Sequence, residues 1–230
     1  WITVCGGTTQ DWSDLSSWIK AREKEQKSWK AVCYNTTAPD CMHIVNLVNP
    51  KVTFGDARGE VEGSQYAPSL AGLRGATGYV CGNLAAVEEP EDVNAAVGAG
   101  KFVLVNEDDQ VKVGVDVNSL TTTNGSTQTE DMKYIETVEA MDLMRDDITN
   151  TFRTDYRGKY KNTTANQMLL LAAINGYFRD LGDENVLDPT YDNTAGVDVT
   201  SQRNAWIDSG KAEAAEWDDG KVISTPYKRT

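Results

Sequence analysis

The sequence predicts a mixed α/β (α+β) fold: a mainly parallel sheet containing a βαβ unit with flanking helices, followed by a helix-rich C-terminal region with a small sheet. The first half alternates short apolar, β-branched runs with an amphipathic helical segment. In the second half, apolar residues recur at every third or fourth position. We therefore predict a core α/β domain over residues 1–118 and a C-terminal domain over 119–230.

The N-terminal part of the chain predicts a strand–helix–strand unit. Residues 2–5 form a short apolar run, and two glycines follow it. Polar residues suited to a helix cap then precede an amphipathic segment over 11–28. Two runs of high β propensity come next, at 29–34 and 43–48. Strand, helix and strand joined by short connections predict a βαβ unit with parallel pairing.

The next elements are shorter. Residues 52–54 predict a short edge strand, and the segment 66–80, rich in alanine, glycine and leucine, predicts a closely packed helix. Pro90 stands at the first position of a further helix that continues to Val97. The runs 101–106 and 111–115 flank an acidic turn and predict a β-hairpin.

The second half is predicted to be largely helical. The polar loop 121–129 leads into an amphipathic helix over about 130–153. A second helix over 164–181 is apolar almost all round between 168 and 174, so we expect it to be substantially buried. Two short helices follow at 201–209 and 211–216, and residues 222–223 are strand-like.

The charge of the chain excludes two classes of partner. Thirty-five acidic residues against twenty-two basic ones give a formal net charge of −13 and a pI near 4.5. Such a surface repels phosphate backbones and anionic lipid, so we expect no direct binding of nucleic acid. No apolar run approaches the roughly 20 residues that a membrane span needs, so we expect no membrane insertion.

The cysteines and the single histidine do not predict a metal site. Cys5, Cys33, Cys41 and Cys81 form no C-x-x-C pair, and His43 has no partner at zinc-finger spacing. We interpret the cysteines as reduced and mostly buried in a protein made in cytoplasm. We therefore expect no metal and no cofactor.

A search for catalytic motifs predicts no catalytic residue. The segment 98–101 resembles the end of a P-loop, but Phe102 stands where a magnesium-binding Ser or Thr is required. A Ser-His-Asp triad would have to use His43, and no serine sits in a G-x-S-x-G elbow. The acidic run 107–109 is explained as a hairpin turn without an ion.

Two stretches of sequence carry a resemblance to a known family. Residues 99–109 read Ala-Gly-Lys-Phe-Val-Leu-Val-Asn-Glu-Asp-Asp, 111–113 read Val-Lys-Val, and 116–122 read Asp-Val-Asn-Ser-Leu-Thr-Thr. Later, 157–160 read Arg-Gly-Lys-Tyr and 169–178 read Leu-Leu-Leu-Ala-Ala-Ile-Asn-Gly-Tyr-Phe. This combination resembles the contractile tail sheath proteins of Gram-positive phages and defective prophages. Residues 8–42 match that family only as a helix followed by a strand.

The resemblance implies a structural, non-enzymatic protein of the virion tail, assembled in the cytoplasm of a bacterial host. Its implied partners are neighbouring sheath subunits, a tail tube protein and a baseplate. In this family the subunits polymerise around the tube, and the sheath contracts to drive the tube through a cell envelope. Either a phage or a tail-like bacteriocin is compatible with the sequence.

The same resemblance implies that the chain is a fragment lacking the terminal arms by which sheath subunits add strands to one another's sheets. Such a fragment is expected to be monomeric. The residues near the two ends of the sequence are then the candidate inter-subunit contacts: Ile2, Val4, Val222, Ile223 and Tyr227.

Two alternatives stay open at this point. A baseplate or receptor-binding module of the same particle would expose an aromatic patch, for which the candidates are Trp12, Trp18, Trp29, Trp206 and Trp217. We expect Trp12 and Trp29 to belong to the core instead. An α/β hydrolase would use His43 in a deep pocket with dispersed carboxylates.

Overall fold

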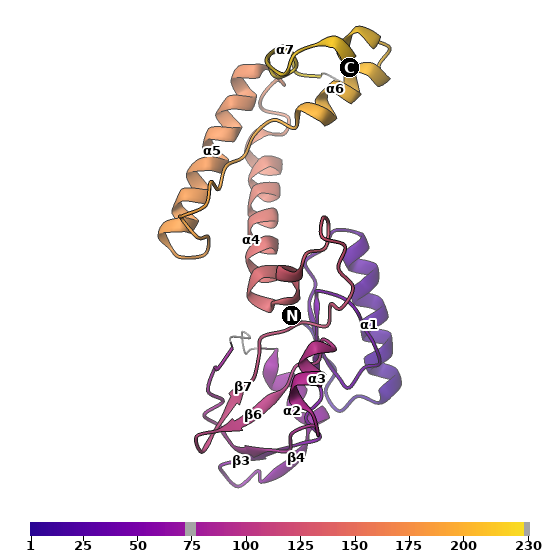
Figure 1. Ribbon diagram of the computed structural model, residues 1–230, viewed down its shortest axis with the longest axis vertical. Coiled ribbons are helices and arrows are strands. Elements are labelled where there is room, and N and C mark those ends of the chain that lie inside the picture. The colour runs from indigo at the N-terminus through magenta and orange to yellow at the C-terminus, as the bar shows by residue number, and fades with distance from the viewer. Residues whose placement is uncertain (72–76, 228–230) are drawn as a thin grey trace. The chain divides into compact units, whose positions relative to one another are not determined.

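The computed structural model describes residues 1–71 and 77–227, which form two compact units (Figure 1). Unit 1 comprises Trp1–Met144 and unit 2 comprises Arg145–Thr230. The predicted mixed α/β class is confirmed, with small sheets and several helices. The boundary predicted after residue 118 lies inside unit 1. Across the described residues, no helix has the length and apolar character required to cross a bilayer.

Parallel pairing occurs where the βαβ unit was predicted. Strands β1 (Ala31–Tyr34) and β2 (Ile44–Leu47) are parallel neighbours, and helix α1 (Thr9–Lys24) precedes them in the chain and packs on β1. Single parallel bridges join Ile2 to β1 and Phe102 to β2. Four chain segments therefore run in the same direction, and the two outer ones are too short to count as strands.

Helix α1 begins earlier than the sequence predicted. Thr8 is the N-cap residue, and its hydroxyl accepts a hydrogen bond from the backbone N–H of Asp11 while the Asp11 carboxylate accepts one from the Thr8 N–H. This reciprocal capping box satisfies backbone donors that the first helical turn leaves unpaired. Trp12 and Ile19 point into the core. The helix ends at Lys24, four residues before the predicted end at Ser28.

The remaining strands pair antiparallel, so among the named strands parallel pairing is limited to β1 and β2, in place of the mainly parallel sheet that was predicted. A three-stranded sheet has the order β4 (Glu60–Glu62), β3 (Lys51–Phe54) and β5 (Leu84–Val87). The prediction of a strand at 52–54 is confirmed, but its placement at an edge is wrong, since β3 is central. The predicted hairpin is confirmed as β6 (Leu104–Glu107) and β7 (Gln110–Val113).

The hairpin turn and the helices of this region follow from local chemistry. Asp108 and Asp109 have φ of 51° and 60°, the left-handed conformation that a two-residue turn between twisted strands requires. Helix α2 (Gly63–Leu70) ends well before Val80, so the prediction of a helix over 66–80 is wrong for its last described residues. Residues 72–76 of that prediction lie outside the described residues. Helix α3 (Val93–Gly98) is capped by the side chain of Asp92.

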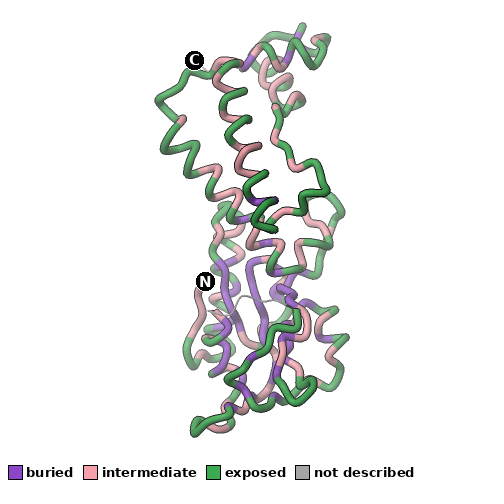
Figure 2. Tube along the Cα trace, turned by 90° about the vertical axis from the view of Figure 1, so that its left-hand side faces the viewer, coloured by how far each residue is buried: buried purple, intermediate pink, exposed green. Residues whose placement is uncertain are grey.

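The hydrophobic core belongs to unit 1. Buried residues are concentrated there, whereas the trace of unit 2 is mostly exposed or intermediate (Figure 2). The largest side chains with almost no exposed surface all come from unit 1. They are Tyr66, Phe102, Ile19, Ile44, Leu47, Leu104, Leu120 and His43.

The described residues of unit 2 are largely helical. A 3₁₀ turn of unit 1 (Glu130–Lys133) leads into α4 (Ile135–Thr151), which continues into a π-helical turn of unit 2 (Phe152–Tyr156). The boundary between the units falls within α4. Helix α5 (Thr164–Asp183) is capped by Thr163. The predicted amphipathic pair of helices is thus confirmed.

The end of the chain differs from the prediction. Helix α6 (Val199–Asp208), a 3₁₀ turn (Ala212–Glu216) and α7 (Asp219–Ser224) follow α5. Residues 222–223, predicted as a strand, lie in α7, whose N-cap Asp218 accepts a hydrogen bond from the Lys221 N–H. A strong capping side chain therefore outweighs the β propensity of a two-residue apolar run. The described residues 119–227 contain no strand, so the predicted small C-terminal sheet is absent from them.

Candidate functional site

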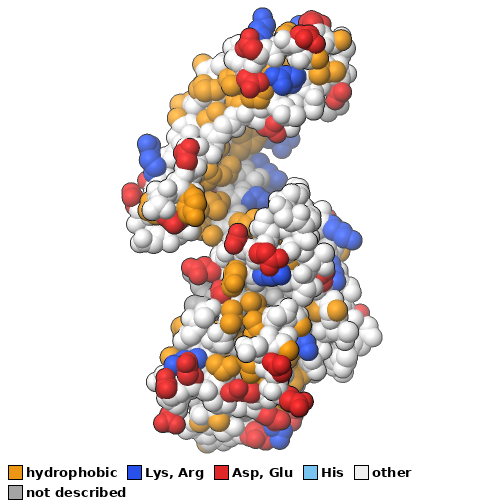
Figure 3. Space-filling model, in the orientation of Figure 1, with side chains coloured by type: hydrophobic (Ala, Val, Ile, Leu, Met, Phe, Trp, Pro, Cys, Tyr) orange, Lys and Arg blue, Asp and Glu red, His pale blue; other side chains and the backbone are white. Residues whose placement is uncertain are grey.

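Unit 2 exposes large apolar side chains that the sequence led us to expect inside. Met168 and Leu169 on α5 are 41% and 50% exposed, and Phe152 and Tyr160 in the preceding segment are 44% and 51% exposed. We call these four residues the apolar helical surface. Hydrophobic side chains also lie along the helices of unit 2 in the space-filling view (Figure 3). The prediction that the segment 168–174 is buried is wrong for this chain.

The positions of these side chains around helix α5 explain why Met168 and Leu169 are exposed. Leu170, Ile174 and Tyr177 recur at helical spacing and line a cavity against the end of α4. Met168 and Leu169 precede this stripe and stay exposed. A helix that is apolar all round needs partners on more than one side, and the described part of unit 2 supplies a partner on one side.

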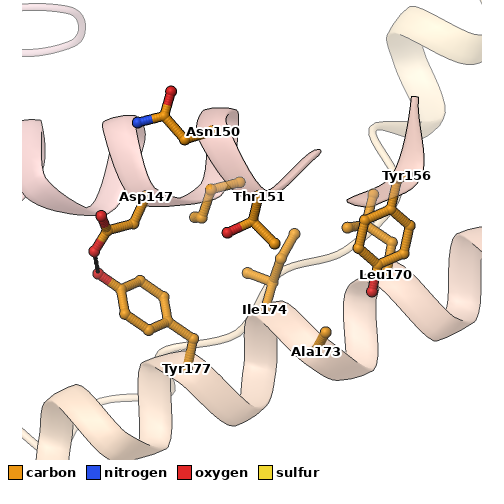
Figure 4. Close-up of a pocket in the computed structure, with 9 residues that line it drawn as sticks. Asp147, Asn150, Thr151, Tyr156, Leu170, Ala173, Ile174 and Tyr177 are labelled. Atoms are coloured by element: carbon orange, nitrogen blue, oxygen red, sulfur yellow. Dashed lines mark hydrogen bonds between the residues drawn. The ribbon is translucent and has the colours of Figure 1, made fainter. Parts of the chain in front are cut away.

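The cavity between α4 and α5 has a volume of about 310 Å³. At one end, the hydroxyl of Tyr177 donates a hydrogen bond of 2.7 Å to Asp147, and Thr151, Ile174 and Tyr156 follow along the lining (Figure 4). Burial and this carboxylate raise the pKa of Tyr177 to about 12. Because these two polar groups bind each other, the polar end of the cavity is satisfied without a ligand.

A second hollow of about 410 Å³ adjoins the first, and Tyr156 and Leu170 line both. The rings of Phe152 and Tyr156 stack nearly parallel with their centroids 6.4 Å apart, and the ring centroid of Tyr160 lies 5.4 Å from that of Tyr156. Aromatic rings offer much contact area with few rotatable bonds, so they are enriched at protein interfaces. The two hollows fall within 147–177, which overlaps the later stretch of the resemblance.

His43 occupies a very different place, in the interior of unit 1. It is 2% exposed, its Nδ1 lies 2.8 Å from Glu23, and its Nε2 lies 3.0 Å from Asp142. Lys30 reaches the same Asp142 carboxylate at 2.6 Å. Burial lowers the pKa of His43, but hydrogen bonds to the two carboxylates outweigh it, and the net shift is upward.

This geometry does not favour the hydrolase alternative. A general base needs a free nitrogen within reach of a nucleophile. Both ring nitrogens of His43 are held by carboxylates, and the nearby Ser119 hydroxyl donates to the Cys41 carbonyl instead. Sequence reasoning missed this cluster because Glu23, His43 and Asp142 are far apart in the chain.

The predicted inter-subunit contacts lie in two different settings. Ile2 bridges β1 of its own chain and, like Val4, is partly buried against the core of unit 1. Val222 is fully buried in α7, and Ile223 beside it is partly buried. Tyr227 packs edge-on against Trp206. The fold does not bring these five residues to one site, and their role between subunits stays a prediction.

The tryptophans differ from the prediction in which of them are buried. Trp12 is buried as expected, whereas Trp29 is 48% exposed and packs edge-on against Trp18, which is 41% exposed. The expectation that Trp29 belongs to the core is wrong, because β1 starts two residues later. Trp206 and Trp217 pack against each other in unit 2.

Comparisons with known proteins show which proteins this chain is similar to. Residues 127–218 match the family described as the phage tail sheath C-terminal domain. Over 218 residues, covering 90% of the chain, the sequence is 26% identical to a tail sheath protein of Clostridium phage phiCD119. The resemblance to tail sheath proteins inferred from the sequence is thereby confirmed.

Solved structures show the same fold. The sheath tail protein of Desulfitobacterium hafniense matches 79% of this chain at 20% identity with a TM-score of 0.68. The sheath tail protein of Listeria innocua matches 78% of it, also at 20% identity, with a TM-score of 0.64. The chain spans 59% of the length of the curated phage relative, and 45% and 44% of the two solved chains.

Proposed function

We propose that this chain is part of a structural subunit of a contractile tail sheath, which polymerises around a tail tube and contracts to drive it through the target cell envelope. The observation that supports this most directly is the match of residues 127–218 to the sheath C-terminal domain. That match also supports the prediction that a C-terminal sheath domain begins after residue 118. The subunit acts mechanically, without a catalytic residue or cofactor.

In this proposal the partner of the apolar helical surface is a second copy of the subunit. A sheath is built from many copies, so a face of one copy is repeatedly presented to the next. Burying apolar area at roughly 25 cal/mol per Å² drives such association. Leu169 and Phe152 are then contacts that are exposed in the dispersed chain and covered in the assembled sheath.

The N-terminal segment supplies the second kind of contact that we propose. The backbone N–H of Ile2 donates to Lys30, and its carbonyl accepts from Val32, so residues around Ile2 and Val4 already behave as a short added strand. The same pairing made between copies would be β-augmentation. Backbone hydrogen bonds of this kind hold subunits together while their bodies shift, as contraction requires.

The remaining partners follow from the same role. We propose that the subunit contacts the tail tube and the baseplate in a virion tail, or in the tail of a related bacteriocin, assembled in the host cytoplasm. The net charge of −13 supports contacts with protein rather than with nucleic acid or anionic lipid.

Electron microscopy of the protein expressed from the complete gene that encodes this chain tests the proposal. We expect hollow tubes in negative stain. Leu169→Lys places a charge on the apolar helical surface and is expected to abolish the tubes, with the thermal unfolding temperature changed little because the side chain is half exposed.

Tyr191→Lys is the matched control, since Tyr191 lies in the same unit, is 73% exposed and stands outside that surface. It is expected to leave the tubes intact. Tubes that form equally well with Leu169→Lys would contradict the proposed contact. A protein that stays dispersed at every salt and protein concentration would contradict the sheath function.

One observation favours a second function. Trp18 and Trp29 form an exposed aromatic pair beside Arg22, whose guanidinium lies 5.4 Å from the Trp18 ring. Such a patch suits a baseplate or receptor-binding module. If Trp18→Ala abolishes attachment to cells while tube formation is unchanged, the binding function is supported; unchanged attachment contradicts it.

A further inference from the structure

Three side chains with metal-binding donor atoms converge inside unit 1. Glu23 comes from α1, and Cys41 and His43 precede β2. The Cys41 Sγ lies 2.9 Å and the His43 Nδ1 lies 2.8 Å from the same carboxylate oxygen of Glu23, and the three donor atoms lie within 4.8 Å of one another. By contrast, the Sγ of buried Cys33 has its acceptor at 4.0 Å.

The separations between the three donor atoms fit a tetrahedrally coordinated metal ion. Zinc bonds of about 2.3 Å to sulfur and about 2.0–2.2 Å to nitrogen and oxygen place neighbouring ligand atoms roughly 3.4–3.6 Å apart. The observed separations, from 2.8 Å upward and all within 4.8 Å, bracket that value. A shift of the Glu23 side chain, which is 22% exposed, is enough to open the centre.

The surroundings of His43 match those of metal-bound histidines. Such a histidine typically donates its second ring N–H to a carboxylate, which fixes the tautomer and turns the other nitrogen toward the metal. Here Asp142 lies 3.0 Å from Nε2, so Nδ1 is the ligand nitrogen, and Lys30 anchors Asp142 in turn. Ser119 also fixes the Cys41 backbone by accepting from its N–H and donating to its carbonyl.

Charge balance is compatible with a divalent cation. Glu23 and Asp142 place two carboxylates against His43, and Lys30 pairs with Asp142. A dication bound there meets negative charge and displaces the Cys41 thiol proton to solvent.

We propose that unit 1 binds one thiophilic divalent cation, of the Zn²⁺ type, through Cys41 Sγ, His43 Nδ1 and the Glu23 carboxylate. A water molecule on the partly exposed Glu23 side completes the tetrahedron. Thiolate and imidazole ligands select Zn²⁺ or Co²⁺ over the hard cations Ca²⁺ and Mg²⁺. The site joins α1 to the segment before β2 and stabilises unit 1. The sequence did not predict it, because the third ligand comes from a helix 18 residues before Cys41.

The test is titration of the chelator-stripped protein with Co²⁺, followed by displacement with Zn²⁺. We expect one Co²⁺ per chain, a thiolate-to-cobalt charge-transfer band, and loss of that band when Zn²⁺ is added. Cys41→Ser is expected to remove the band and to weaken Zn²⁺ binding at least about tenfold. Glu23→Gln, at a partly exposed position, is expected to weaken binding similarly and serves as the second variant if Cys41→Ser fails to fold.

Two controls make the result specific. Cys81→Ser alters another buried thiol, and Cys5→Ser removes the exposed one; both are expected to keep the band. Absence of a thiolate band in the unmodified protein overturns the proposal, as does a band that persists in Cys41→Ser or disappears in Cys5→Ser. The measurement does not depend on whether the protein forms tubes.

Discussion

The two units use their apolar residues in opposite ways. Unit 1 closes its β-strands and α1 around a dense core, and even its buried polar groups, such as Asn49 and His43, are hydrogen-bonded. Among the described residues of unit 2, the buried hydrophobic side chains are Leu181, Ala214 and Val222. Its remaining large apolar residues are partly or largely exposed. We infer that unit 1 is stable alone, whereas the helices of unit 2 gain stability from assembly.

The largest difference between the units is expected from truncating one apolar side chain in each. Phe102 is 2% exposed and bridges β2, so Phe102→Ala should destabilise unit 1 by about 3–5 kcal/mol. Leu169 is half exposed, and Leu169→Ala should cost unit 2 less than about 1 kcal/mol in the dispersed chain. Amide hydrogen exchange read separately for each unit measures both, since one melting curve does not resolve two units. Equal losses of protection would remove the contrast.

Glycine substitutions are expected to act with opposite signs. A Cβ at Gly63 would clash with the Asn49 carbonyl and come within 2.7 Å of the Tyr34 ring, so Gly63→Ala should destabilise unit 1 by about 1–3 kcal/mol. Gly176 lies inside α5, where the nearest atom to a new Cβ is 3.9 Å away. Gly176→Ala should therefore stabilise unit 2 by about 0.5–1 kcal/mol. Chemical denaturation monitored by hydrogen exchange checks both, and a destabilising Gly176→Ala would show that α5 is more tightly packed than described.

The smallest effect is expected from pH in unit 2. The pKa of Tyr177 is raised to about 12, because burial and the Asp147 carboxylate disfavour the phenolate. A raised pKa in the folded state adds stability that is present below the ordinary tyrosine pKa, near 10, and is lost as pH rises toward 12. The phenolate absorbance of Tyr177, taken as the difference from Tyr177→Phe, should titrate in that range. Titration near pH 10 would mean that the Asp147 bond is not held in solution.

The sequence predicted the features of this structure that are determined by residues close together in the chain, and it missed those that depend on distant residues. The hairpin at 104–113 and helix α5 were predicted because turn chemistry and apolar spacing lie within a few residues. The central position of β3 was missed, since whether a strand has one neighbour or two depends on segments that are distant in sequence. The exposure of Leu169 was missed because apolar spacing indicates which faces need burial without indicating whether this chain or another copy covers them.

The evidence for function likewise came partly from contiguous motifs and partly from residues that only the fold brings together. The resemblance rested on contiguous motifs and was confirmed by comparison. The Glu23–Cys41–His43 cluster, by contrast, required the fold, since α1 brings Glu23 to the start of β2. At residues 222–223 the local pattern was misleading: two β-branched residues predicted a strand, but the segment forms a helix capped by the side chain of Asp218.

Hydrogen exchange of α5 in dispersed and assembled protein from the complete gene tests the central claim most directly. We expect the amides of α5 to exchange at least about tenfold faster than those of β2 in dispersed protein, and to slow markedly once tubes form, while those of β2 change little. If α5 is already as protected as β2 before assembly, the rest of the protein covers the helix. Unchanged α5 exchange after tubes form would likewise contradict the claim that a second copy packs on it.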